Sequence, residues 1–478
     1  MIFSKKTSYK HIAIIYLFFF TSFIYASHIQ LEEKKEDFSA YLTSDSQIKS
    51  ETNPPIINIS KAKNSVLPLL MASLIHKGVT NLYIGDSINL LDTKAVFDIL
   101  THLGAKIIQN NGMVSIDTTE VKPIFIDQKL SSRTRYSSLA LGSLASRFGF
   151  AKVGQPGGCN FKRPIDFHIK ALQELGFEII EKENSIYIVR QKEAKNIVTL
   201  PYPSVGTTLN AIFAASSLKG NDKIIEIHNC AIEPEIDDVI NFLNKIGLKI
   251  DRKGRVIKVS TLRQHMTHII SHIPINDRIE AGTYMLAAAI LKKRIKIIDA
   301  PLEFMEAVLN LLKQLGCSST INDNSIIING NELNCNASIN LSTAPYPGFP
   351  TDLQPILTVL CTTLRNPSFL KEEVIPNRTD YILELNKMGA KIDFKKGEIK
   401  IFPTPFLNTY GQLVQVSSTD LRATMAIILY AIHNNICCKI DQFNLIYRGY
   451  TDVHDKIQSI GGKLEYQSNY ADSFSQIQ

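Results

Sequence analysis

Six polar or charged positions recur at equivalent places in this chain, each at the start of a long apolar run. Each stands 37–43 residues ahead of a glycine that follows a second, amphipathic run. If the apolar runs are helices, these positions are helix N-termini, where backbone N–H groups lack partners and the helix dipole is positive. Several such termini around one cleft would bind an anion. The positions are Lys63, Arg135, residues 204–206, Arg278, Asp352 and Arg422.

A less specific interpretation is that all six are ordinary N-caps. It does not explain why Lys and Arg are so frequent among them, because cations are unfavourable at the N-terminal end of a helix. The pattern therefore favours an anion site, although any one of the six could still be only a cap.

The elements that position these residues belong to a repeat. A Leu/Ile-x-x-hydrophobic-Gly pattern recurs at intervals of 69–73 residues, which predicts six structural repeats. Each glycine should end an amphipathic helix, because glycine adopts the left-handed conformation at little cost. The repeat glycines are Gly104, Gly176, Gly247, Gly316, Gly389 and Gly461.

A second helix is predicted ahead of each amphipathic one. Its sequence is almost uniformly apolar, so it should be buried on most sides. β-Branched runs between the helices, such as 223–229 and 294–300, are typical of strands. Each repeat is therefore predicted as strand–helix–strand–helix–strand, which gives an α/β fold. Clear apolar helices lie at 65–75, 209–218, 283–291 and 422–432.

The composition excludes several classes of protein. With 478 residues, 45% of them apolar, the chain is long enough for about three domains and is not a disordered one. The net charge of +7 is spread along the chain, which suits anionic small molecules better than nucleic acid. Seven irregularly spaced cysteines with no CxxC indicate neither a disulfide framework nor a zinc site. We expect no metal and no organic cofactor.

The N-terminus carries a different signal. Residues 12–26 form a 15-residue apolar run preceded by three lysines, the layout of a secretory signal. The run is short for a membrane-spanning helix, which needs about 20 residues. We predict that residues 1–38 are a targeting or anchoring segment with a linker, so membrane contact through 12–26, export and organelle targeting all stay open.

From about residue 40 to 466, the chain resembles the enolpyruvyl transferases, and among them the branch that uses UDP-N-acetylglucosamine. The matches occur in order and in register with the repeat. The related shikimate-pathway branch lacks the stretches PGGC (156–159) and TAPYPGFPTD (343–352). The other matching stretches are 60–68, 132–142, 160–168, 204–208, 233–238, 277–283, 377–390, 418–424 and 447–450.

The resemblance implies a two-domain fold, an inside-out α/β barrel with three repeats in each domain. One domain would comprise 39–60 and 272–466, the other 61–271, and 467–478 would be a tail. It also implies the reaction: the enolpyruvyl group of phosphoenolpyruvate moves to the 3′-hydroxyl of UDP-N-acetylglucosamine through a tetrahedral ketal, the first committed step of peptidoglycan synthesis. Both substrates are cytosolic metabolites, so we expect a cytoplasmic enzyme. The oligomeric state stays open.

Phosphoenolpyruvate carries a phosphate and a carboxylate, and arginine side chains suit both groups. By match to the family, Lys63, Arg163 and Arg448 are the phosphate-binding cations. Arg378 and Arg422 are expected to support the donor carboxylate or the closed cleft.

Three residues are expected to move protons or stabilise charge. By match to the family, Cys159 is the general acid at the vinyl carbon and the thiol that the antibiotic fosfomycin alkylates. Asp352 is expected to take the proton from the 3′-hydroxyl, although it could also be a simple helix cap. Asp420 is expected to orient Lys63 or to stabilise the oxocarbenium stage.

The nucleotide sugar is expected to contact one polar rim of the site. Backbone amides around residues 204–206 suit its diphosphate, and Asp166 could accept a hydrogen bond from the uracil. The expected contacts are Asn64, Arg135, Arg163, Pro164, Ile165, Asp166, Phe167, Tyr202, Pro203, Ser204, Val205, Gly206 and Val374.

The chain departs from the family pattern at several positions. Lys61 replaces a glycine, which would cost about 1 kcal/mol or more if that backbone needed positive φ. The step from Cys159 to Arg163 is one residue shorter than usual, Tyr202 replaces a lysine, and Ile232 replaces an arginine. Two alternatives therefore stay open: a paralogue that binds nucleotide sugar without turnover, and a transferase with another acceptor.

Overall fold

The computed structural model describes residues 38–44, 53–158, 164–182, 184–216, 223–260, 268–404 and 413–466. Contacts divide the chain into a unit Met1–Phe38 and a unit Ser39–Gln478, and every helix and strand named below belongs to the second unit. The predicted targeting segment at 12–26 and the tail at 467–478 lie outside the described residues. Among the helices that the structure describes, none combines the length and apolar character needed to cross a membrane.

The six repeat glycines follow six helices, as the sequence predicts. Each glycine lies two residues beyond the end of its helix and has a φ between 84° and 105°. Glycine adopts this left-handed backbone at little cost, so the chain can leave the helix and enter a strand. These helices are α3 (Leu91–His102), α6 (Asp166–Glu174), α8 (Pro234–Lys245), α10 (Glu306–Gln314), α12 (Asp380–Lys387) and α14 (Val453–Ser459).

The apolar runs form a second set of helices, buried on nearly all sides. They pack on one another, α5 against α2 and α7, and α11 against α9 and α13. Gly142 of α5 permits a close approach, because a Cβ there would lie 2.6 Å from the Asn210 side chain of α7. The set comprises α2 (Lys63–Ala72), α5 (Leu139–Phe148), α7 (Val205–Ala215), α9 (Arg278–Leu291), α11 (Gln354–Thr362) and α13 (Leu421–Asn434).

Strand pairing sorts the described strands into six sheets, which form two groups. The first sheet group has the orders β13-β3-β5-β4, β6-β8-β7 and β11-β12-β10-β9. Its strands are β3 (Val79–Tyr83), β4 (Lys106–Asn110), β5 (Met113–Asp117), β6 (Phe150–Gly154), β7 (Phe177–Lys182), β8 (Ser185–Arg190), β9 (Ile197–Thr199), β10 (Ile224–His228), β11 (Lys249–Lys253), β12 (Val256–Ser260) and β13 (Ile269–His272).

The second sheet group has the orders β15-β16-β14-β2, β17-β18-β20-β19 and β21-β22-β1-β23. The N-terminal strand β1 lies between β22 and β23, so the two ends of this unit share one sheet. The strands are β1 (Ala40–Ser44), β2 (Ile56–Asn58), β14 (Arg294–Ile298), β15 (Ser318–Asn322), β16 (Ser325–Asn329), β17 (Asn340–Ser342), β18 (Ser368–Lys371), β19 (Lys391–Lys395), β20 (Glu398–Phe402), β21 (Val414–Ser417), β22 (Cys438–Asp441) and β23 (Gly462–Tyr466).

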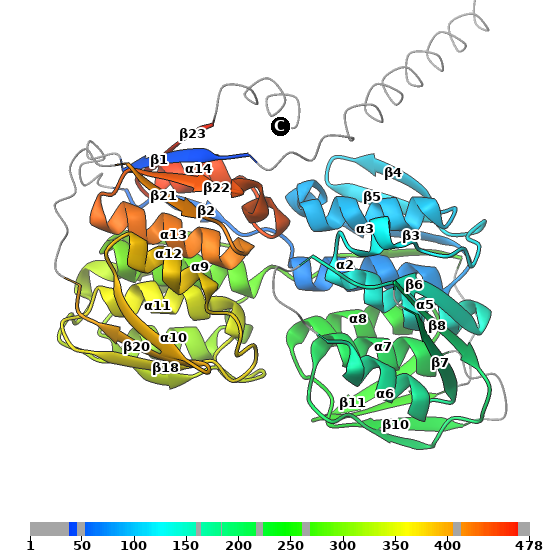
Figure 1. Ribbon diagram of the computed structural model, residues 1–478. Helices are drawn as coiled ribbons and strands as arrows, with labels where there is room; N and C mark the ends of the chain where they lie inside the picture. The colour runs from blue at the N-terminus through cyan, green and yellow to red at the C-terminus, as the bar shows by residue number, and fades with distance from the viewer. Residues whose placement is uncertain are drawn as a thin grey trace, which may run out of the picture. The chain divides into compact units, whose positions relative to one another are not determined.

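Most repeats contain one strand more than predicted, because they close with a β-hairpin. Between β4 and β5, for example, Asn111 and Gly112 have φ of 46° and 75°, which turns the chain back on itself. In both sheet groups the helices lie inside and the sheets outside (Figure 1). This arrangement confirms the predicted inside-out α/β fold.

The chain crosses between the sheet groups twice. The strand before each crossing pairs with the group that the chain is about to leave. Strand β2 precedes the first crossing and pairs in parallel with β14, whereas β13 precedes the second crossing and pairs in parallel with β3. Elsewhere a parallel pair joins strands of one repeat, as in β9 with β10 and β17 with β18. The exchange ties the two groups together, and the domain boundaries themselves stay a prediction.

Lys61 lies in the first crossing and has no positive φ. It forms an antiparallel bridge with Asn276 of the second crossing. The backbone cost that the sequence raised for this position therefore does not arise, because a bridging residue has extended backbone that any side chain tolerates.

Candidate active site

A cavity of about 510 Å³ is lined by residues of both sheet groups. All six N-terminal positions that the sequence singled out line it. Its volume is in the range of small-molecule sites. The fold thus brings together side chains that are more than 350 residues apart in the sequence, such as Lys63 and Arg422.

Most of these six positions are not helix caps. The residue before each buried arginine does the capping: Asp277 accepts hydrogen bonds from the N–H groups of residues 279 and 280, and Asp420 accepts from those of 422 and 423. Asp352 lies in the short 3-10 helix η6 (Thr351–Leu353) and caps neither it nor α11. Ser204 alone of the six makes a side-chain cap. The arginine and aspartate side chains of these positions therefore serve other contacts.

One cluster on the cavity wall joins Lys63, Asp92 and Arg448. Asp92 Oδ2 lies 2.6 Å from Lys63 Nζ, and Asp92 Oδ1 lies 2.6 Å from Arg448 Nη2. Burial by itself would raise the pKa of Asp92, but the two cations outweigh burial and lower it. Burial also lowers the pKa of Lys63, against the opposing effect of Asp92. The cluster holds two cations on one carboxylate and so has a net positive charge.

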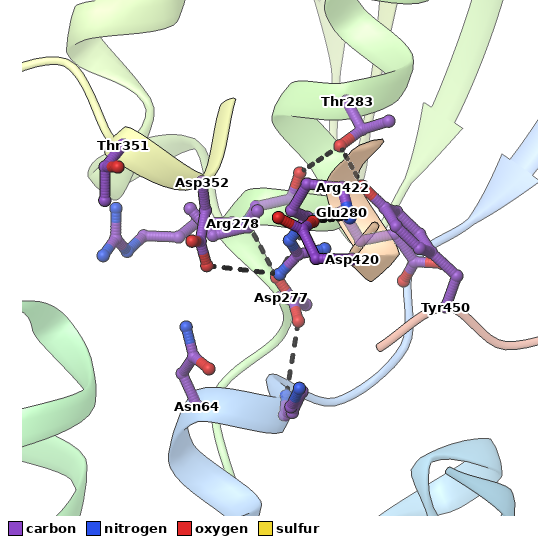
Figure 2. Close-up of polar contacts among 12 residues, drawn as sticks. Asn64, Asp277, Arg278, Glu280, Thr283, Thr351, Asp352, Asp420, Arg422 and Tyr450 are labelled. Carbon is purple, nitrogen blue, oxygen red and sulfur yellow. Dashed lines mark hydrogen bonds and ion pairs between the residues drawn. The ribbon is translucent and has the colours of Figure 1, made fainter. Parts of the chain in front are cut away.

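A second cluster joins Asp352, Arg378 and Arg422. Asp352 Oδ1 accepts a hydrogen bond from Arg378 Nη1 at 2.8 Å, and Oδ2 lies 3.5 Å from Arg422 Nη2. Figure 2 shows Arg422 between Asp352 and the ring of Tyr450, over which its guanidinium lies at 4.9 Å. Burial would raise the pKa of Asp352, yet Arg378 and Arg422 outweigh it and hold this pKa well below its usual range.

Several predicted contacts of the nucleotide sugar line another part of the wall. The rings of Phe167 and Tyr202 are stacked with centroids 6.3 Å apart, and Arg135 Nη2 donates to the carbonyl of Pro164 at 2.8 Å. Asn64 Oδ1 accepts from the hydroxyl of Tyr136 at 2.8 Å. Predicted residues that line the cavity are Lys63, Asn64, Arg135, Pro164, Asp166, Phe167, Tyr202, Pro203, Ser204, Val205, Gly206, Asp352, Val374, Arg378, Arg422 and Arg448.

Cys159 and Arg163 lie outside the described residues. Gly158, directly before the cysteine, lines the cavity, and its carbonyl accepts a hydrogen bond from Arg448 Nη1. Its φ is +83°, and a Cβ there would lie 2.5 Å from Arg448 Nη2 and 3.0 Å from the backbone N of Arg135. Only glycine fits between these groups.

Comparison with known protein families shows the family of this chain. The sequence profile of the EPSP synthase (3-phosphoshikimate 1-carboxyvinyltransferase) family matches residues 50–457. The chain belongs to the EPSP synthase family. Members of this family are transferases, so the chain belongs to a family of enzymes.

Three relatives with similar sequences are UDP-N-acetylglucosamine 1-carboxyvinyltransferases. That of Kosmotoga olearia is 36% identical over 414 residues, which cover 86% of this chain and 95% of the relative. That of Clostridium acetobutylicum, numbered 1, is 37% identical over 418 residues, covering 86% and 96%. That of the Wolbachia of Brugia malayi is 34% identical over 428 residues, covering 87% and 98%. Within the EPSP synthase family, the chain therefore belongs with this branch.

Solved structures of the family share the fold. The enolpyruvyl transferase NikO from Streptomyces tendae has a TM-score of 0.77 at 16% identity and covers 90% of this chain and 99% of its own. An EPSP synthase from Acinetobacter baumannii has a TM-score of 0.66 at 15% identity and covers 90% and 100%. At these identities the likeness shows the fold alone, and it confirms the predicted architecture.

Two contacts expected from the family resemblance are replaced by others in the described structure: that of Asp420 with Lys63, and that of the Ile165 side chain with the cavity. Asp420 caps α13 and lies 3.5 Å from Arg378 Nε, while the carboxylate beside Lys63 is Asp92. Ile165 does not line the cavity: its side chain is 8% exposed and belongs to the hydrophobic core. The Ile165 side chain turns away from the cavity because apolar packing uses it. Asp420 Oδ2 faces Arg378 of the cavity wall, and the expected role of Asp420 at the oxocarbenium stage stays a prediction.

The sequence provided no signal for two further residues that line the cavity, Asp92 and Glu235. Asp92 is 3% exposed, yet in the sequence it is indistinguishable from the acidic residue common in the first turn of a helix. Arg278 pairs with Glu235 at 3.0 Å, and both line the cavity. A signal existed only for Arg278, through its place in the repeat.

The described buried cysteines are poor nucleophiles. Burial raises the pKa of the thiols of Cys230, Cys361 and Cys438 to about 12. The thiolate is the reactive form of cysteine, so these three thiols are nearly inert near neutral pH.

Proposed function

We propose that this chain transfers the enolpyruvyl group of phosphoenolpyruvate to the 3′-hydroxyl of UDP-N-acetylglucosamine and releases phosphate. The observation that carries the proposal is that two cation clusters, each built on one carboxylate, line one cavity. The donor has two anionic groups, so each cluster can receive one. Membership in the UDP-N-acetylglucosamine branch supports the choice of acceptor.

The donor phosphate is proposed to bind Lys63 and Arg448, with Arg163 added by match to the family. Both described cations share a single carboxylate, Asp92, and a phosphate dianion can take further hydrogen bonds from both. Because the two cations come from α2 and from the end of η7 (Phe443–Arg448), the phosphate would join segments at opposite ends of the chain.

The donor carboxylate is proposed to bind Arg378 and Arg422, and this has a consequence for Asp352. While both arginines neutralise Asp352, its low pKa makes it a weak base. If the donor carboxylate takes hydrogen bonds from the same arginines, Asp352 loses part of that stabilisation and becomes more basic. Donor binding would thus prepare the base for the acceptor.

In the addition step, Asp352 takes the proton of the sugar 3′-hydroxyl as the sugar oxygen bonds to C2 of the donor. A proton from Cys159 adds to C3 at the same stage and gives the tetrahedral ketal. In the elimination step, the Cys159 thiolate left by the addition takes a proton from C3 and the C2–O bond to phosphate breaks. Phosphate departs with the bond's electron pair and takes the proton held by Asp352. No oxidant or reductant is needed.

The Cys159→Asp variant should keep transfer activity and resist fosfomycin. A carboxylic acid can still donate a proton, whereas alkylation by the epoxide needs the thiolate. The measurement is time-dependent loss of activity with fosfomycin. A Cys335→Ser variant, which changes a half-buried thiol elsewhere, is the matched control and should stay sensitive. Equal sensitivity of Cys159→Asp and the wild type would mean that another group is alkylated.

Phosphate release tests the reaction directly. Release should require both phosphoenolpyruvate and UDP-N-acetylglucosamine. Release only with shikimate 3-phosphate would point to another acceptor. Binding of the nucleotide sugar without any phosphate release would mean a non-catalytic paralogue, for which the replacements at Tyr202 and Ile232 are the candidate causes.

The two sheet groups are proposed to be the two domains, with 61–271 in one and 39–60 with 272–466 in the other. This is supported by the strand pairing, which changes group at both crossings. We place the enzyme's action in the cytoplasm, because both proposed substrates are made there; the role of residues 12–26 stays a separate prediction.

A further inference from the structure

The two crossings between the sheet groups run side by side. The N–H of Ala62 donates to the carbonyl of Ile275 at 2.8 Å, and the N–H of Asp277 donates to the carbonyl of Ser60 at 2.9 Å. Lys61 and Asn276 are the bridged pair between these two bonds. Two residues further on is Lys63, whose N–H lies 3.3 Å from Asp277 Oδ2. The geometry of the crossings therefore decides where the helix that bears Lys63 begins.

Buried acids fix both ends of this crossing pair. On the second-group side, Glu280 is fully buried and accepts from the N–H of Ser60 at 2.8 Å and from its hydroxyl at 2.6 Å. On the first-group side, Asp238 accepts from Ser65 and from the N–H of Ile275. Figure 2 shows Glu280, in the first turn of α9, and Asp277, directly before that helix. A different side chain holds the middle of the two crossings, at the bridged pair Lys61 and Asn276.

That side chain is Lys61. Its Nζ donates to Asn276 Oδ1 at 2.7 Å, and Asn276 Nδ2 donates in turn to the carbonyl of Asp299, beyond β14, at 2.8 Å. The Lys61 carbonyl accepts from the hydroxyl of Ser87 at 2.6 Å. One residue thus links both crossings and a segment of each sheet group.

We propose that Lys61 is a positioning residue, which fixes the two crossings against each other through Asn276 and thereby sets the place of Lys63 at the donor subsite. The inference rests on the proposed function, and it assigns a role to a position where the family resemblance expects glycine. Lys61 itself does not line the cavity, so it acts through Lys63 and not on the substrates. Since the tie involves a half-buried side chain, its removal should leave the fold intact.

The test compares Lys61→Met, which keeps most of the stem and loses the donor, with Lys61→Arg, which keeps it. In Lys61→Met, KM for phosphoenolpyruvate should rise roughly three- to tenfold, the size expected for one hydrogen bond of this kind. KM for the nucleotide sugar and the melting temperature should stay close to wild type, and Lys61→Arg should restore the donor KM. A Lys77→Met variant, at an exposed lysine beyond the same helix, is the matched control.

Two further measurements do not depend on turnover. Hydrogen exchange at the amides of Ala62 and Asp277 should become roughly three- to tenfold faster in Lys61→Met. Inorganic phosphate, used as the probe of the Lys63 cluster, should bind more weakly by a similar factor. If the proposed reaction fails but these two effects appear, the positioning role holds without it. Unchanged exchange and unchanged phosphate affinity would overturn the role, as would failure of Lys61→Arg to restore them.

The pairing can be tested on its own. Lys61→Met should change the exchange rates no further when it is added to Asn276→Ala, because Asn276→Ala already removes the Nζ–Oδ1 bond. Fully additive effects of the two changes on exchange would contradict the proposed link.

Discussion

The Asp352→Asn variant should release phosphate about 10²- to 10⁴-fold more slowly than the wild-type chain at saturating substrates, the loss typical of a missing general base. The amide has the shape of the carboxylate and can accept from Arg378, but it cannot take the proton of the 3′-hydroxyl. KM for the nucleotide sugar should change little, because the rest of the cavity wall is untouched. The measurement is steady-state phosphate release with both substrates.

Asp393→Asn, on the exposed side of β19, is the matched control and should behave as wild type. The Asp352 variant also removes one charged partner of Arg378 and of Arg422, so its melting temperature must be recorded beside its rate. A rate within tenfold of wild type in a folded variant would mean that Asp352 is not the base.

The Asp92→Asn variant should lose about 3–5 kcal/mol of the free energy of unfolding, because it removes the carboxylate charge that lies between Lys63 and Arg448. Lys63, Asp92 and Arg448 have side chains only 9%, 4% and 14% exposed, so water cannot replace the lost charge. Urea unfolding measures the effect. Asp98→Asn is the matched control: Asp98 pairs with Arg133 at 29% exposure, and its loss should cost at most about 1 kcal/mol.

Lowering the pH should remove the same stabilising contribution of Asp92 by protonating its carboxylate. The two cations lower the pKa of Asp92 in the folded chain, so its stabilisation is complete above the unfolded pKa of about 3.9 and is lost as the pH falls through the folded value. Asp92→Asn should lack this part of the pH dependence, and its stability should converge toward wild type in acid.

Stabilisation by inorganic phosphate tests whether the cluster of Lys63, Asp92 and Arg448 binds an anion or is only structural. If Lys63 and Arg448 receive the donor phosphate, free phosphate should stabilise Asp92→Asn more than it stabilises wild type, because it then supplies the missing negative charge. Equal stabilisation of the two proteins would argue against a phosphate subsite at this cluster.

Much of the fold could be predicted from local chemistry. A glycine beyond an amphipathic helix is a local signal, and all six repeat glycines have the predicted left-handed backbone. The apolar runs likewise predicted the buried helices, since burial on all sides needs no knowledge of the neighbour. The hairpin closing most repeats was missed, because a turn such as that at Asn111 and Gly112 is short and lies inside a β-branched stretch.

For the candidate site, too, only features with a local sequence signal could be predicted. The sequence by itself determined which side chains stand at the buried helices' N-termini, because the repeat places them there. Only the tertiary structure decided what those side chains do: Asp352 binds two arginines and caps nothing, Asp92 pairs with Lys63 in place of Asp420, and Lys61 ties the crossings together. These partners lie dozens to hundreds of residues apart, and no local pattern fixes which of several carboxylates a buried cation will meet once the strands β2 and β13 have exchanged groups.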